Sequence, residues 1–296
     1  MLPMKRTFFI LIYTMFLLFP IFSFGNSEGK NSTDLMNSTN QRIVSLSPAV
    51  TEILFAIDAE ASLVARTDFC TWPPEAESLP SVGGFDGKSI SLETLLAFEP
   101  DLVCIASGMH DYLIQPLEQF GIDVFVSSAD SISEIFSEIQ ELSLLVGCDE
   151  EGKNLIQKIQ EQLEQAEKIA INKPMQKVYW EVSSSPYFSC GKFSFITEAI
   201  ELAGAKNIFG YVPQSYPQVS EESIIASEAD VIIFPDYTES GDISFILQRP
   251  NWQQIPAVAK GRVYAVNSDL FSRPGPRIGE MVLTLVQILY EYDVIE

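Results

Sequence analysis

The sequence predicts an α/β protein in which two lobes, each built on a largely parallel sheet, share a ligand cleft. Three observations predict this architecture: β-branched runs alternate with helical stretches, one long helical pattern lies mid-chain, and one segment recurs on either side of it. The 296 residues are 47% hydrophobic, which is ample apolar material for a sizeable core.

The N-terminus has the pattern of a secretory signal. Lys5 and Arg6 precede a largely apolar run over 7–24, and the small residue Gly25 offers a cleavage point, so residues 1–25 are interpreted as a signal peptide. The run is nearly long enough to span a ~30 Å hydrocarbon core, so a retained membrane anchor is the alternative. Both interpretations place the folded part in the periplasm or another extracytoplasmic compartment. No cysteine closely follows the run, which argues against a lipid anchor.

Composition and periodicity divide the rest of the chain into four parts. Residues 26–41 are polar and poor in large apolar side chains, which is typical of a flexible tether. We expect an N-terminal α/β lobe over 42–148, a linking helix over 149–173 and a C-terminal α/β lobe over 174–296.

In the first lobe, short apolar runs alternate with helical patterns. Ser47 followed by Pro48 is a typical helix start, and it opens a predicted helix that ends near residue 57. A second helix is predicted over 131–146. The predicted strands are 42–47, 63–67, 101–106 and 123–127.

The linking helix is predicted from an apolar stripe on an otherwise polar segment. Leu155, Ile159, Leu163 and Ala166 recur at helical spacing within 150–171. About 22 residues at ~1.5 Å each give a single long helix of roughly 33 Å, enough to cross between lobes. We expect this spacer to be rigid and to permit only limited hinge motion. In the second lobe, strands are predicted over 177–182, 230–235 and 262–266, and helices over 195–203 and 276–292.

One segment occurs in related form in both lobes. Residues 91–105 align with 220–234, and each copy is interpreted as a serine-capped helix, a turn and a strand that begins at aspartate. The repeat therefore predicts two Rossmann-like lobes on related plans. Glu93 and Glu222 occupy matched places, where a carboxylate either stabilises the helix end or docks on a basic site of a partner.

Charge and motif content exclude several functions. The chain has 18 Lys+Arg against 40 Asp+Glu, a net charge of −22, which argues against nucleic-acid binding. The four cysteines lack C-x-x-C spacing, which argues against a zinc site and a dense disulfide framework. The single histidine, His110, is interpreted as a solvent-facing loop residue. A hydrolase would need it as a base, and no orienting partner is evident from the sequence.

Aromatic side chains gather in glycine-, proline- and serine-rich loops of both lobes. Such a concentration favours a broad apolar surface for a flat ligand, although single aromatic residues are more often core. Asp269 and Arg273 could bind amide or carboxylate groups of a ligand, or simply form a loop ion pair. The aromatic candidates are Phe69, Trp72, Phe85, Tyr187, Phe188 and Tyr216.

Together these segments resemble the substrate-binding proteins of ABC importers for cobalamin, haem and iron-siderophore complexes. The resemblance covers nearly all of 42–292. Its motifs are the stretch 42–54, Trp72-Pro-Pro-Glu, Val82-Gly-Gly-Phe, Ser91-Leu-Glu, Pro100-Asp-Leu-Val, Pro217-Gln-Val-Ser-Glu-Glu222 and Arg273-Pro-Gly-Pro-Arg-Ile278.

The resemblance is greatest to the cobalamin-binding members, and it implies a monomeric, non-enzymatic carrier that holds a corrinoid as transported ligand, with no resident cofactor or metal. It also implies that Glu93 and Glu222 dock on arginines of the ABC permease. A family tryptophan after the Pro-Asp-Leu-Val strand falls on Ala106 here. Binding of haem or a ferric siderophore is the alternative, with Tyr187, Tyr216 or His110 as iron ligands. The implied contacts with the corrinoid fall on or near Phe69, Phe85, Phe188, Tyr216, Asp269 and Arg273.

Overall fold

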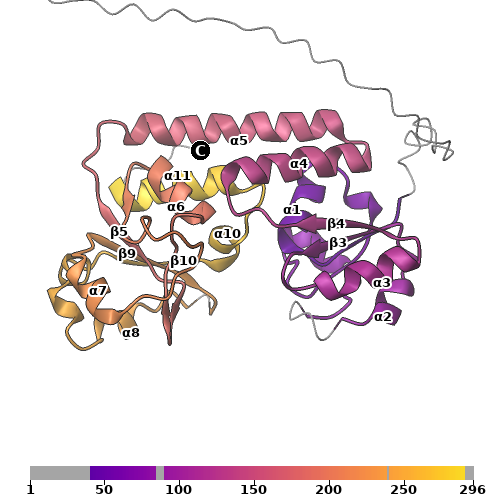
Figure 1. Ribbon diagram of the computed structural model, residues 1–296. Helices are drawn as coiled ribbons and strands as arrows, with labels where there is room; N and C mark the ends of the chain where they lie inside the picture. Colours follow the sequence, from indigo (N-terminus) through magenta and orange to yellow (C-terminus); the bar gives the residue numbers. More distant parts are fainter. Residues whose placement is uncertain (1–40, 85–89, 239, 291–296) are drawn as a thin grey trace, which may run out of the picture. The chain divides into compact units, whose positions relative to one another are not determined.

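The computed structural model describes residues 41–84, 90–238 and 240–290 (Figure 1). The predicted signal peptide, nearly all of the predicted tether, and Phe85 therefore lie outside the described residues. Within the described ranges, no helix combines the length and the apolar character needed to cross a bilayer.

The first lobe contains the predicted parallel sheet. Its strands run in the order β2-β1-β3-β4, and every neighbouring pair is parallel. The two central strands, β1 and β3, are buried on both faces, as expected when helices cover a parallel sheet. Their bounds are β1 Ile43–Ser45, β2 Leu63–Arg66, β3 Leu102–Ala106 and β4 Asp123–Ser127.

The second lobe repeats this plan. Its order β10-β9-β5-β8, read from the other edge as β8-β5-β9-β10, matches that of the first sheet strand for strand. A short antiparallel hairpin, β6 and β7, lies where the sequence predicts a loop. The bounds are β5 Lys177–Trp180, β6 Ser183–Ser184, β7 Tyr187–Phe188, β8 Lys206–Asn207, β9 Val231–Asp236 and β10 Val263–Asn267.

Hydrogen bonds at the strand starts confirm the internal repeat. Asp101 Oδ2 accepts the backbone N–H of Arg42 at 2.8 Å, and Asp230 Oδ2 accepts that of Lys177 at 2.9 Å. Arg42 and Lys177 also point their side chains at matched backbone carbonyls before these aspartates. The aspartate that opens each repeated strand thus fixes its partner strand in the same way.

The helices before these strands begin alike. The Ser91 hydroxyl caps α2 (Leu92–Leu96) and the Ser220 hydroxyl caps α7 (Glu221–Ala226), each by accepting the backbone N–H three residues later. The other α-helices are α1 Pro48–Ala56, α3 Ile114–Gln119, α4 Ile132–Val146, α5 Asp149–Ala170, α6 Phe195–Leu202, α8 Ser244–Leu247, α9 Pro256–Ala259, α10 Ser268–Ser272 and α11 Ile278–Tyr290.

Helix α5 packs on α4 from one lobe and on α6 and α11 from the other (Figure 1). Ile159, Leu163 and Ala166 of the predicted stripe are buried. Two glycines allow close approach: a Cβ at Gly152 would collide with a side chain of α4, and one at Gly279 would collide with a side chain of α5. Buried residues of both sheets and of all four helices form one continuous apolar core.

Candidate ligand-binding cleft

A cavity of about 640 Å³ lies where strands of both sheets end. The first lobe contributes Ser47 after β1, Ser107 after β3 and loop residues 127–130 after β4. The second lobe contributes Tyr237 after β9 and residues around Asp269 after β10. The carboxyl ends of parallel strands are where α/β proteins bind ligands, so this cavity is the candidate site.

Three of the predicted contact residues, Phe69, Asp269 and Arg273, line this cavity. Trp72 is connected to the cavity through Arg277. The Arg277 guanidinium carbon lies 4.6 Å from the centroid of the Trp72 ring, and Arg277 shares the carboxylate of Glu52 with the cavity residue Arg273. Phe69 and Trp72 lie about 200 positions before Asp269 and Arg273 in the sequence, and the fold brings the two pairs together.

Phe188 and Tyr216 do not line the cavity in this structure. Phe188 lies in β7 and forms a bridge with Gln218, just beyond Tyr216. Tyr216 is 42% exposed, although it lies outside the cavity lining. The neighbouring Ser215 reaches the cavity wall, where its hydroxyl donates to Asp130 Oδ2 at 3.3 Å.

The residue that organises the predicted contacts is Glu52, which sequence reasoning missed. Its carboxylate, on α1, is 2% exposed. It accepts hydrogen bonds from Arg273 Nη1 at 2.8 Å and from Arg277 Nε and Nη2 at 2.8 and 2.7 Å. The available signal was an acidic residue flanked by apolar ones in the first predicted helix, since a buried carboxylate needs a partner.

The Arg273 guanidinium is bonded on several sides. Besides Glu52 it contacts Asp269 Oδ2 at 2.6 Å, and it donates to the Phe69 carbonyl and to Thr71 Oγ1 at 2.9 and 3.0 Å. Only 11% of the Arg273 side chain is exposed, against 42% for Asp269. Asp269 is therefore the more accessible of this pair.

The wall after β4 is held by a second buried carboxylate, Glu138. Its Oε1 accepts the backbone N–H groups of Ser128 and Ala129, and its Oε2 accepts the Ser127 hydroxyl at 2.8 Å. Burial is the largest cause of a raised pKa for Glu138, because it disfavours the charged form.

Glu138→Gln is expected to be tolerated, whereas Glu138→Ala is expected to lower the free energy of unfolding by about 3 kcal/mol, because alanine leaves two buried N–H groups without their acceptor.

The raised pKa of Glu138 also predicts how stability depends on pH. A group whose pKa is raised on folding stabilises the protein most below its unfolded pKa, and that contribution is lost as pH rises through the folded pKa. Wild type should therefore lose stability relative to Glu138→Gln as the pH rises above 4.5, the ordinary pKa of a glutamate. Urea unfolding at several pH values measures this, with Glu118→Gln as an exposed control. A difference in stability between wild type and Glu138→Gln that does not change with pH would contradict the raised pKa of Glu138.

His110 is fully buried, so the prediction of a solvent-facing residue was wrong. Its Nδ1 accepts the Ala106 backbone N–H at 3.3 Å, which ties the ring to the end of β3. Across the described part of the chain, no three histidine, cysteine or acidic side chains are grouped so as to hold a metal ion. Cys70, Cys104, Cys148 and Cys190 are free thiols.

The sequence matches the family model for periplasmic binding proteins over residues 43–270. The chain belongs to the periplasmic binding protein family. The match spans both repeated lobes and the strand ends that form the cavity.

Curated relatives of this periplasmic binding protein match most of its length. A vitamin B12-binding protein of Vibrio parahaemolyticus is 26% identical over 249 residues, covering 83% of this chain and 88% of the relative. An uncharacterized ABC transporter substrate-binding lipoprotein of Bacillus subtilis is 29% identical over 272 residues, covering 89% of this chain and 84% of the relative.

Solved structures agree with the two-lobed fold. The periplasmic vitamin B12-binding protein of Vibrio cholerae has a TM-score of 0.70 at 26% identity, covering 84% of this chain and 96% of that one. A possible iron-binding protein of Staphylococcus epidermidis has a TM-score of 0.74 at 28% identity, covering 84% and 98%. A haem-binding protein of Vibrio cholerae shares the fold, with a TM-score of 0.76 at 24% identity, covering 84% and 99%.

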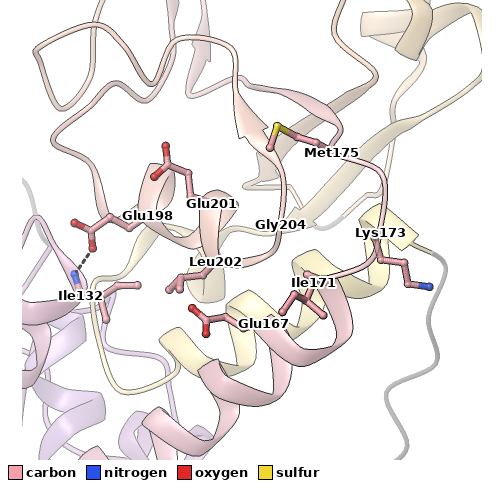
Figure 2. Close-up of a pocket in the computed structure, with 10 residues that line it drawn as sticks. Ile132, Glu167, Ile171, Lys173, Met175, Glu198, Glu201, Leu202 and Gly204 are labelled. Carbon is pink, nitrogen blue, oxygen red and sulfur yellow. Dashed lines mark hydrogen bonds between the residues drawn. The ribbon is translucent and has the colours of Figure 1, made fainter. Parts of the chain in front are cut away.

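A second hollow in this periplasmic binding protein, of about 700 Å³, lies at the end of α5 beside α6 (Figure 2). Its floor includes Ile171 and Leu202, and Glu167, Glu198 and Glu201 line it as well. It contains none of the predicted contact residues, and Glu198 is already bonded to a backbone N–H. The cavity of about 640 Å³ at the strand ends therefore remains the candidate ligand site.

Glu93 and Glu222 are both exposed in the first turns of α2 and α7. Hydrogen bonds from the backbone N–H of Glu93 and from Ser91 lower the pKa of the Glu93 carboxyl. Each is accessible to a partner, and each also has the position in which a carboxylate stabilises a helix end.

Proposed function

We propose that this periplasmic binding protein captures cobalamin or a related corrinoid in the cleft and delivers it to an ABC permease without transforming it. The supporting observation is the charge of the cavity. Asp130, Asp269 and Arg273 are the charged residues that line it among those described, which is an excess of one carboxylate, and the Arg273 guanidinium is paired with both Glu52 and Asp269. The cavity therefore presents mainly hydrogen-bond acceptors to the ligand.

A corrinoid suits these groups chemically. It is a flat macrocycle whose edge carries amide side chains, and amide N–H groups donate to carboxylates and hydroxyls. Asp130, Asp269 and the serines after the strand ends supply such acceptors, while Phe69 and Tyr237 offer ring surface. The carboxylates of haem and the anionic groups of many ferric siderophores would instead meet carboxylates, at an electrostatic cost.

One observation favours haem as the second candidate. Tyr237 lines the cavity, and a tyrosine oxygen is an established haem-iron ligand. The other predicted iron ligands fit less well: His110 is fully buried, and the Tyr187 ring packs against Trp252 at 5.9 Å. Tyr237 is 68% exposed.

Residues 1–25 would direct the chain out of the cytoplasm and 26–41 would tether the folded part. Glu93 and Glu222, one on each lobe, would contact basic residues of the permease, so that a monomer engages both halves of the transporter. The vitamin B12-binding relatives and the substrate-binding lipoprotein support this assignment.

Parallel titrations test the ligand. Purified protein is titrated with cyanocobalamin, haemin and a ferric siderophore, and binding is followed by calorimetry and visible absorbance. We expect saturable one-to-one binding of cyanocobalamin, at least tenfold tighter than that of the other two ligands. Haemin binding that is lost in Tyr237→Phe would establish the second candidate and reject the first.

A further inference from the structure

The loop that joins β4 to α4, residues 128–131, and the first residue of α4, Ile132, are held by three carboxylates through five successive backbone N–H groups. Glu138 accepts those of residues 128 and 129, and Glu134 accepts those of residues 130 and 131. Glu198 accepts the fifth, that of Ile132, at 2.8 Å. Charge-assisted bonds of this kind are among the stronger hydrogen bonds in proteins.

Glu198 differs from the other two because it belongs to the opposite lobe. Glu134 and Glu138 lie on α4, the helix that the loop enters, whereas Glu198 lies on α6. Figure 2 shows the Glu198 carboxylate reaching from α6 to the backbone nitrogen of Ile132. A second contact, from Ser215 to Asp130, ties the same loop to the same lobe.

Helix α4 does not need Glu198 in order to begin. Ser131 and Glu134 already form a complete capping box at its N-terminus, in which each side chain bonds the other residue's backbone N–H. The additional bond from Glu198 therefore links the two lobes and is not needed to cap the helix.

The same loop forms a wall of the ligand cavity through residues 128–130. We infer that Glu198 is a positioning residue for ligand binding: by holding Ile132 from the opposite lobe, it fixes the cavity wall in its binding position. This role rests on the proposed function, since it concerns the ligand that the cleft receives. Without this bond the loop keeps its contacts with α4 but loses a tie to the opposite lobe, and ordering it against that lobe at the moment of binding costs affinity.

The test compares Glu198→Ala, Glu198→Gln and the control Glu201→Ala, whose glutamate lies on the same helix and lines the same groove. Amide hydrogen exchange without ligand reports the loop, cyanocobalamin titration reports affinity, and thermal unfolding reports the fold. In Glu198→Ala we expect faster exchange at residues 130–132 and roughly threefold to tenfold weaker binding. Glutamine can accept the same N–H, so Glu198→Gln should restore both, and Glu201→Ala should match wild type.

Two results would overturn the role. Unchanged exchange in Glu198→Ala would show that the bond does not hold the loop. Faster exchange with wild-type affinity would show that the loop needs no such positioning. Failure of wild type to bind any corrinoid is a separate outcome, which rejects the proposed function.

Discussion

Glu52→Ala is expected to lower the free energy of unfolding by about 3–5 kcal/mol, because it removes the buried carboxylate that pairs with both Arg273 and Arg277 and leaves Arg273 to the partly exposed Asp269. The two arginine side chains are only 11% and 15% exposed. The loss is larger than for an exposed ion pair, which contributes about 0–1 kcal/mol. Chemical denaturation followed by tryptophan fluorescence measures it.

The matched control is Glu118→Ala, since Glu118 is an exposed glutamate on α3 and should change stability by no more than about 0.5 kcal/mol. Glu52→Gln keeps the shape and removes the charge, so its cost should lie between the two. An alanine variant as stable as Glu118→Ala would show that the buried network contributes nothing to the fold.

Reversing both docking carboxylates, Glu93→Lys with Glu222→Lys, is expected to abolish ligand uptake in cells that depend on this protein while leaving ligand affinity intact. Lysine would place a positive charge against the basic sites expected on the permease, and like charges across an interface oppose association. Both side chains are exposed, so the fold should tolerate the change.

The control makes the same change of charge elsewhere, with Glu151→Lys and Glu161→Lys on the exposed face of α5. Uptake should persist there, because the charge change is the same and only its place differs. Loss of ligand binding in the Glu93 and Glu222 double variant would contradict the docking role, as would normal uptake.

Much of the fold follows from local signals. The alternation of apolar runs and helical patterns predicts every strand of the two main sheets except β8, which is only two residues long. The 91–105 and 220–234 repeat predicts matched lobes, and the matched bonds of Asp101 and Asp230 show why the aspartates recur: each fixes a neighbouring strand.

The site is harder to predict because its residues meet only through tertiary structure. Glu52 and Arg273 are 221 positions apart, and neither local sequence predicts that the two side chains form an ion pair. The exposure of His110 was predicted wrongly for a similar reason. Its loop has a polar composition, but its ring accepts a hydrogen bond from Ala106 at the end of β3. The rule that ligands bind at carboxyl strand ends would have indicated Ser47, Ser107 and Tyr237 without a structure.

Hydrogen exchange of wild-type protein with and without cyanocobalamin tests the ligand cleft most directly. Bound corrinoid should slow exchange in the loops after β1, β3, β4 and β10, including residues 127–130 and 269–273, and leave the groove beside α6 unchanged. Slower exchange confined to that groove, or none anywhere at saturating ligand, would contradict the assignment of the cleft.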